Sequence, residues 1–231
     1  MISIRRANDR GHTKLGWLDS RHSFSFGDYF DPKENGFSVL RVINDDRVAA
    51  GQGFGTHPHR DMEIITYVLQ GAVEHRDSLG TRTVIPAGDV QRMTAGSGIR
   101  HSEFNPSPSA GLHFLQIWIL PEAPGLKPGY EQQTLGGRTK GRLALAASHT
   151  GGDGGLTINQ DASLYIGSFA RGEGDEKVIA PGRKAYAHVS RGHLALNGAP
   201  LAEGDGAKIT DESRIKVVAE EDAEVLLFDL P

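Results

Sequence analysis

The amino-acid sequence predicts an all-β protein, built as a sandwich or a barrel. Apolar runs are short and separated by turn residues, and no long stretch repeats apolar residues with the period of a helix. The 30 glycines and 11 prolines provide the turns that such short strands require. A chain of 231 residues holds either one large β domain or two domains of about 100–130 residues.

Short strands follow one another along the first half of the chain. Alternating and continuous apolar runs predict strands at residues 2–6, 62–71, 99–104 and 111–121. Residues 72–90 are typical of a hairpin that turns near Gly80. Residues 37–48 are expected to form a strand, a turn at residues 44–46 and a second strand, because asparagine and aspartate favour turns.

The composition changes near the middle of the chain. Residues 121–133 contain three prolines and no apolar period, which predicts a linker. Strands are expected to restart after it, at residues 142–150, 163–170 and 224–231.

An internal repeat supports a division into two similar parts. The residues that end at Gly71 resemble those that end at Gly192, and the Gly88-Asp89 pair resembles Gly204-Asp205. We therefore predict two domains, residues 1–133 and residues 134–231.

Two pairs of side chains are candidates for a metal site. His57 and His59 are two residues apart, so on a strand they point to the same face and can reach one ion. His101 and Glu103 have the same spacing. Histidines in half-buried strands often have only a structural role, but two such pairs favour a metal site. Imidazole and carboxylate together suit a divalent transition metal.

The second half of the chain is expected to hold no metal. When the two halves are aligned on their glycines, the four candidate positions become apolar: Val178, Ala180, Val217 and Ala219. We expect these residues to pack in a core.

Glycine, proline and acidic residues around the histidines carry a resemblance to a known superfamily. Two motifs of this chain resemble those of cupins: Gly51, His57, His59 and Gly71 match the first motif, and Gly80, Pro86, Gly88 and Asp89 match the second. Ile64 and Gln91 stand where a general cupin has further ligands. The replacement of these ligands by His101 and Glu103, within THPHRDMEIITYVLQG and GSGIRHSEFN, is similar to the pirin family.

The resemblance implies a bicupin with two antiparallel β-barrels of the double-stranded β-helix (jelly-roll) type. It implies one divalent metal ion per chain, held in the first barrel by His57, His59, His101 and Glu103. Iron is the metal implied first, and Mn, Co, Ni, Cu and Zn stay open.

The resemblance also implies an activity. Bacterial pirin-like proteins resemble quercetin 2,3-dioxygenases, which cleave a flavonol such as quercetin with O2 and release carbon monoxide. Glu103 is then a ligand, a general base, or both. The animal member implies an alternative, a metal- or redox-sensing regulatory protein that acts through a protein partner.

Charge and composition exclude several other classes of partner. The formal net charge is -4 and basic residues are scattered, so nucleic acid is not expected to bind directly. The N-terminus has no apolar signal region, and no apolar run is long enough to cross a membrane. We therefore expect a cytoplasmic protein, and the lack of cysteine fits a reducing compartment.

Other polar and aromatic residues have two interpretations each. His75 either orients a metal ligand or, as we expect, is a surface or hairpin histidine. Gln91 and Gln116 either line a pocket or bond to backbone. Aromatic residues of the strands form either a wall for a flat ligand or ordinary core: Phe54, Phe114 and Trp118.

Overall fold

The computed structural model describes all 231 residues and is almost entirely β-structure, with short 3-10 helices and no α-helix. The all-β prediction is therefore confirmed. Contacts divide the chain into an N-terminal unit (Gly11–Leu135 and Leu156–Gln160) and a C-terminal unit (Met1–Arg10, Gly136–Gly155 and Asp161–Pro231). None of the helices is long and apolar enough to cross a membrane.

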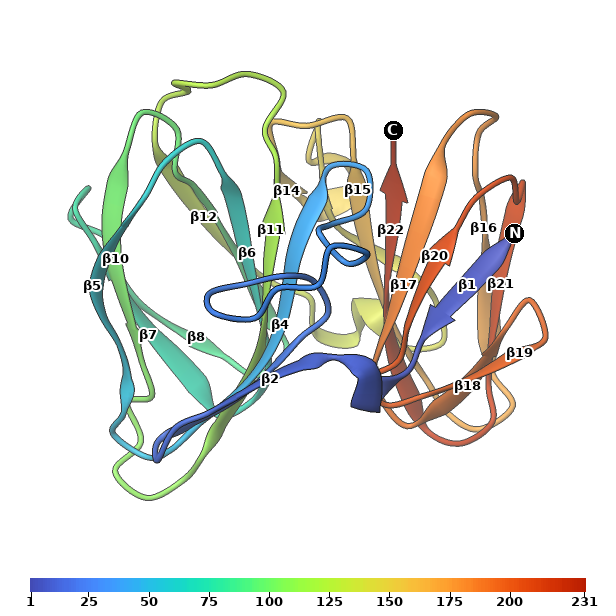
Figure 1. Cartoon of the computed structure of the whole chain (residues 1–231), viewed down its shortest axis with the longest axis horizontal. Coiled ribbons are helices and arrows are strands. Elements are labelled where there is room, and N and C mark those ends of the chain that lie inside the picture. Colours follow the sequence, from blue (N-terminus) through green and yellow to red (C-terminus); the bar gives the residue numbers. More distant parts are fainter. The chain divides into compact units, whose positions relative to one another are not determined.

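The N-terminal unit consists of two facing sheets (Figure 1). A 7-stranded sheet has the order β12-β9-β6-β11-β4-β3-β2, and a 4-stranded sheet has the order β5-β10-β7-β8. Its strands are β2 (Gly11–Lys14), β3 (Leu18–His22), β4 (Leu40–Val48), β5 (Gly53–His59), β6 (Glu63–Gln70), β7 (Ala72–Asp77), β8 (Arg82–Pro86), β9 (Asp89–Thr94), β10 (Ile99–Phe104), β11 (Leu112–Ile119), β12 (Gly129–Thr134) and β14 (Leu156–Thr157).

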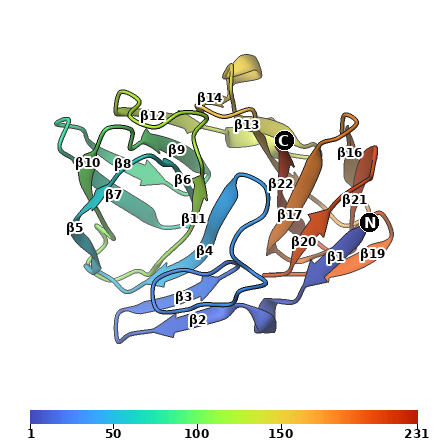
Figure 2. The same cartoon turned by 45° about the horizontal axis from the view of Figure 1, so that its top comes forward.

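The C-terminal unit repeats this arrangement (Figure 2). One sheet contains β1-β20-β17-β22-β15-β13 in this order, and a 4-stranded sheet has the order β16-β21-β18-β19. Its elements are β1 (Ile2–Arg5), η1 (Ala7–Asp9), η2 (Gly136–Thr139), β13 (Ala144–Ser148), η3 (Gly152–Gly154), β15 (Ser163–Phe169), β16 (Gly174–Val178), β17 (Lys184–Arg191), β18 (His193–Leu196), β19 (Ala199–Ala202), β20 (Gly206–Ile209), β21 (Arg214–Ala219) and β22 (Ala223–Leu230).

The strands of each unit pair within separate sheets, so the two closed barrels stay a prediction. The division into domains at residues 133 and 134 also stays a prediction. The contacts group the first ten residues with the C-terminal unit, because β1 pairs with β20 from Ile2↔Ile209 to Arg5↔Gly206.

Two local predictions are wrong. The expected turn at residues 44–46 is the middle of β4, because β3 and β11 pair with this segment on both sides and hold it extended. The expected linker over residues 121–133 contains the start of β12, which pairs with β9 from Gly129↔Thr94 to Thr134↔Asp89. The three prolines come before this strand, where they break no hydrogen bond of the sheet.

The N-terminal unit has two separate apolar clusters. The larger contains Phe114 of β11 and Val68 of β6, and the smaller contains Ile64 of β6, with Trp118 of β11 packed against it. Gln116 and Thr66 occupy the inward positions between these residues on the same two strands, because side chains of one face recur every second residue. The two clusters therefore leave a polar layer between them.

Candidate metal centre

A row of polar side chains forms this layer. Backbone register places it across five neighbouring strands of the 7-stranded sheet, in the order His22, Asn44, Gln116, Thr66 and Gln91. All five side chains are buried. Because buried polar groups are costly unless they are hydrogen-bonded, such a row needs specific partners.

Three histidines converge from the 4-stranded sheet. His57 and His59 lie on β5, His101 lies on β10, and the register pairs His101 with His57. The ring centroids are 4.5 to 4.9 Å apart. One ring nitrogen of each histidine lies within 4.8 Å of the other two. Strand pairing thus brings together side chains that the two-residue spacing places on one face.

The ring nitrogens leave lone pairs inside the cluster. His57 Nδ1 lies 2.8 Å from the carbonyl oxygen of Gly55 and donates to it, so His57 Nε2 carries a lone pair. His101 Nε2 is 3.1 Å from this atom, and His59 Nε2 is buried without a hydrogen-bond partner. Nitrogens in this arrangement fit a divalent transition metal, which takes neutral imidazole as a ligand.

Burial keeps two of these imidazoles neutral. It lowers the pKa of His59 to about 4, and the charges of protonated His101 and His57 add to the effect. It also lowers the pKa of His101 to about 3, together with repulsion from His57 and His75. Because a metal competes with protons for the same lone pairs, these two nitrogens are available at neutral pH.

The carboxylate of Glu103 reaches the polar row of the facing sheet. Its Oε2 accepts a hydrogen bond of 2.6 Å from Gln116 Nε2. Its Oε1 accepts from Thr66 Oγ1 at 3.2 Å and from Gln91 Nε2 at 3.4 Å. A Glu103 oxygen forms a second group of ligand-capable atoms with nitrogens of His75 and His101, but it lies outside the group of three histidines. The polar row therefore holds the carboxylate beside His101.

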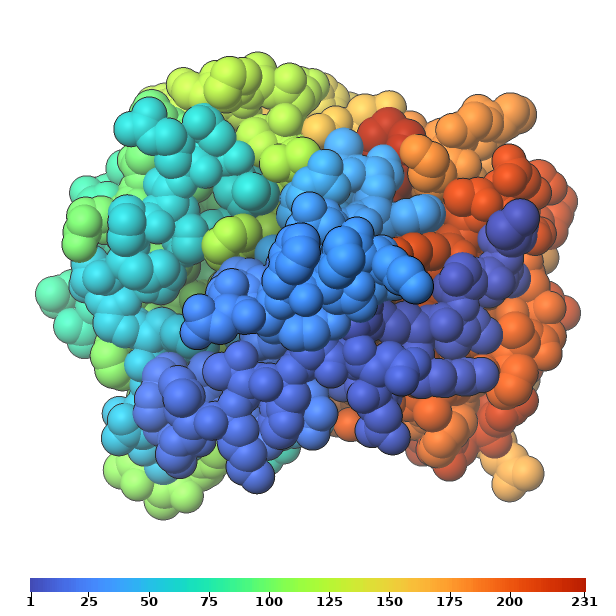
Figure 3. Space-filling model, in the orientation of Figure 1, coloured from blue at the N-terminus to red at the C-terminus, as the bar shows by residue number.

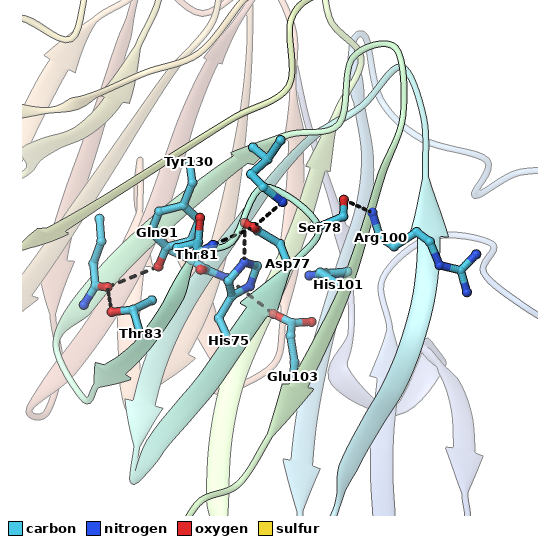
Figure 4. Close-up of polar contacts among 12 residues, drawn as sticks. His75, Asp77, Ser78, Thr81, Thr83, Gln91, Arg100, His101, Glu103 and Tyr130 are labelled. Atoms are coloured by element: carbon cyan, nitrogen blue, oxygen red, sulfur yellow. Dashed lines mark hydrogen bonds and ion pairs between the residues drawn. The ribbon is translucent and has the colours of Figure 1, made fainter.

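His75 lies in the hairpin of β7 and β8, as one part of the expectation had it, but it is fully buried and not at the surface. Strand pairing places it opposite Glu103, and its Nε2 lies 3.1 Å from Asp77 Oδ2 (Figure 4). Asp77 also accepts from the backbone amides of Leu79 and Thr81. Burial raises the pKa of Asp77, but the hydrogen bonds outweigh burial and lower the pKa overall. His75 is thus fixed by an ionised carboxylate.

A cavity of about 290 Å³ opens beside the histidines. His57, His59 and Glu103 line it, and Phe26 and Trp118 add aromatic rings whose centroids are 5.4 Å apart. Phe26 belongs to the segment between β3 and β4, which stands at the surface in blue in Figure 3. The volume is near the lower end of the range for small-molecule sites, roughly 300–1,000 Å³, and the aromatic walls suit a flat ring.

The other predicted pocket residues divide between the cavity and the core. Phe54 lines the cavity, as Trp118 does, whereas Phe114 belongs to the larger apolar cluster. Gln116 lines the cavity, and both Gln116 and Gln91 donate to Glu103 rather than to backbone.

One buried carboxyl group in the cavity wall was not predicted from the sequence as a site residue. Asp46 lies on β4, lines the cavity and is 3% exposed. Burial raises the pKa of Asp46 to about 7. A hydrogen bond with Ser20 opposes the shift, and the like charges of Asp45 and Glu103 add to it.

The raised pKa predicts a pH-dependent effect of Asp46→Asn on the stability of the metal-free protein. Folded Asp46 holds its proton up to about pH 7, whereas the unfolded carboxyl has a pKa of 3.8. The carboxyl group of Asp46 makes its full contribution to the free energy of unfolding of wild type below the unfolded pKa. This contribution is lost as the pH rises to about 7. As the pH rises from 4 to 8, the free energy of unfolding of the asparagine variant should increase by a few kcal/mol relative to that of wild type. Urea unfolding at pH 4 and pH 8 measures this change. An equal difference in unfolding free energy between variant and wild type at both pH values would contradict the prediction.

Both groups of ligand-capable side chains lie in the N-terminal unit. In the C-terminal unit, β16 pairs with β21 as β5 pairs with β10. The predicted packing is confirmed for Val217 and Ala219, which are buried in the core of this unit.

The predicted packing of the other two positions is wrong. Val178 is 68% exposed, and Ala180 is also exposed. The register places Asp175 opposite Val217, as His57 is opposite His101. Alignment on glycines chose different positions because it does not account for loops of different length between the strands.

Comparison with known proteins gives matches over both units. The Pirin family model matches residues 3–119, and a model described as quercetinase C-terminal cupin domain matches residues 145–230. The quercetin 2,3-dioxygenase of Escherichia coli K12 is 51% identical over 231 residues, which are 100% of this chain and 99% of that protein.

Solved structures agree with these matches. Bacterial pirin YhhW from Escherichia coli, in complex with nickel(II), has a TM-score of 0.96 at 51% identity, covering 100% of this chain and 99% of that one. The protein YhaK from Escherichia coli has a TM-score of 0.76 at 32% identity, covering 90% of this chain and 92% of that one.

Proposed function

The chain belongs to the pirin family, and from this premise we propose that it is a metal-dependent dioxygenase of the quercetinase type. It cleaves a flavonol such as quercetin with O2 and releases carbon monoxide. The observation that carries the proposal is the cluster of His57, His59 and His101, in which His57 and His59 line a cavity with aromatic walls. A relative at 51% identity bears the name quercetin 2,3-dioxygenase.

The donor set fits one divalent transition metal ion per chain. His57, His59 and His101 would supply three nitrogens, and Glu103 would supply an oxygen from the neighbouring group. Iron is our first choice, and the nickel(II) in the structure of YhhW shows that the bacterial relative takes another divalent ion of the same series. Three imidazoles and a carboxylate leave room for a substrate oxygen if the ion is five- or six-coordinate.

The residues around the ion would bind the flavonol and move its proton. When bound, the metal supplies Lewis-acid activation of the flavonol 3-hydroxyl, as metal ions do for water. Glu103 accepts the proton of that hydroxyl, and Gln116, Thr66 and Gln91 hold the carboxylate in place by hydrogen bonds. Phe26 and Trp118 orient the flat ring system and exclude water.

Aerobic turnover tests the proposal. Protein reconstituted with iron, and separately with nickel, should consume quercetin and release carbon monoxide in equal amounts, and chelated protein should release none. Metal-loaded protein with about one ion per chain and no carbon monoxide from any flavonol would contradict the enzyme. That result would favour the alternative, a metal-sensing regulatory protein with a protein partner.

His75 is expected to strengthen metal binding without being one of the four proposed ligands. Its link to Asp77 fixes the ring opposite Glu103, and residues that orient metal ligands typically contribute about 10–100-fold to affinity. His75→Ala should therefore bind nickel about 10–100-fold more weakly in competition with a chelator. His193→Ala, at an exposed histidine of the C-terminal unit, is the control and should bind as wild type does. Equal affinity of His75→Ala and wild type would show that the histidine only packs.

A further inference from the structure

Asp46 has a polar atom that the folded chain leaves unused. Its side chain is almost fully buried and lines the cavity, and its Oδ1 has no hydrogen-bond partner. An unpaired polar atom in the interior destabilises the folded protein, because it has lost its hydrogen bonds to water. Most buried polar atoms are paired in native proteins, so this one requires an explanation.

The elements packed around Asp46 provide no cation for it. On its own strand, Asp45 is bound to Arg47 and His113, at 3.1 and 2.7 Å from its Oδ1. On β3 the residue opposite Asp46 is Ser20, and on β11 it is Phe114. The charged groups that act on it are the carboxylates of Asp45 and Glu103, which have the same sign.

These surroundings favour the neutral carboxylic acid. Burial and like charges both disfavour the carboxylate, and the raised pKa agrees with this direction. A hydroxyl can pair with Asp46 in either protonation state, because it donates to a carboxylate and both donates to and accepts from a neutral carboxyl group. A hydroxyl is therefore the partner that best satisfies Oδ1.

The cavity restricts which molecule can bring that hydroxyl. Asp46 shares the cavity with His57, His59 and Glu103, and Asp46 is absent from both groups of ligand-capable atoms. A metal ion held by the histidines therefore does not account for it. The aromatic walls from Phe26 and Trp118 suit a flat ring, so the expected partner is an aromatic hydroxyl.

We propose that Asp46 is a specificity residue that binds one phenolic hydroxyl of the flavonol, other than the 3-hydroxyl that Glu103 deprotonates. This inference rests on the proposed function of the cavity and goes further, because it makes hydroxylation of the flavonol rings a condition of tight binding. A flavonol that lacks this hydroxyl leaves Asp46 unpaired in the complex, and sites built to pair a hydroxyl discriminate strongly against its absence.

The test compares ligands and variants in the same titration. Quercetin and a set of flavonols that each lack one other hydroxyl, but keep the 3-hydroxyl and the 4-carbonyl, are titrated calorimetrically without O2 into nickel-loaded protein. For wild type, one member of the set should bind about 10–100-fold more weakly than quercetin. For Asp46→Leu, quercetin should weaken to the level of that member, and the difference between the two ligands should vanish.

Two further variants keep the test decisive. Asp46→Asn keeps a donor and an acceptor of the same shape, so it should retain most of the preference even if the leucine variant folds poorly. Asp161→Asn changes an exposed aspartate of the C-terminal unit that does not line the cavity, and it should bind every flavonol as wild type does. Circular dichroism and nickel content establish that each variant is folded and loaded.

The outcomes separate this inference from the proposed function. Equal ligand preferences in wild type and Asp46→Leu would overturn the role of Asp46 while leaving the flavonol reaction intact. The absence of any flavonol binding to loaded wild-type protein would overturn both.

Discussion

The His57→Ala/His101→Ala double variant is expected to retain no metal after reconstitution, whereas wild type should retain about one ion per chain. The two histidines face each other across β5 and β10 with their Nε2 atoms 3.1 Å apart, so both would contact the same ion. Loss of a residue that merely orients a ligand costs about 10–100-fold in affinity. Loss of two ligands should cost far more and leave the site empty at micromolar metal.

Elemental analysis after gel filtration measures this loss. His193→Ala, in the C-terminal unit, is the matched control and should keep one ion per chain. Circular dichroism of the double variant should remain that of wild type, because neither histidine belongs to an apolar cluster. A metal ion that survives in the double variant would place the site elsewhere and contradict the ligand assignment.

The strand period explains why much of the candidate site could be predicted from the sequence. Side chains two residues apart share a face, so His57 and His59, and likewise His101 and Glu103, had to lie together wherever strands formed. Short apolar runs between glycines gave β6, β10 and β11 nearly to their ends. Both features depend only on residues that are close together in the sequence, so the sequence is sufficient to predict them.

Residues that depend on partner strands were not predictable in this way. Asn44, Asp45 and Asp46 have the composition of a turn, but pairing with β3 and β11 on both sides makes them the centre of a strand. His75 lies near a hairpin turn, yet it is buried because it faces Glu103 across the strand pair. In both places a prediction from neighbouring residues fails where the fold buries polar side chains. Such failures are expected at functional sites.

The C-terminal unit shows the same limit. Its core position Val217 could be predicted from the repeat, but Val178 could not be placed, since only strand register shows that Asp175 faces Val217. A layer of polar residues lies between the apolar clusters of the N-terminal unit, whereas Val217 and Ala219 belong to the apolar core of the C-terminal unit. The difference in chemistry between the units therefore follows from side chains, within one shared arrangement of strands.

The hydrogen bonds of Glu103 give its replacement by glutamine a specific expected result. Glu103→Gln keeps the shape and one weak oxygen ligand but removes the proton acceptor. If Glu103 deprotonates the flavonol, flavonol turnover should fall about 10²–10⁴-fold, the usual contribution of general acid–base catalysis. Most of the metal should remain, because the three histidines are unchanged.

Metal content and turnover, measured on the same Glu103→Gln sample, distinguish a base from a ligand. Gln91→Met is the control, because it keeps the carboxylate and removes two hydrogen bonds, one to Glu103 at 3.4 Å and one to Thr66 Oγ1 at 2.9 Å. It should lose less than about 30-fold, since each bond contributes about 1 kcal/mol. If Glu103 is only a ligand, occupancy and turnover should fall together, and added metal should restore both. Turnover close to wild type at full occupancy would rule out the base, and orientation of the flavonol at the metal would then be the main source of catalysis.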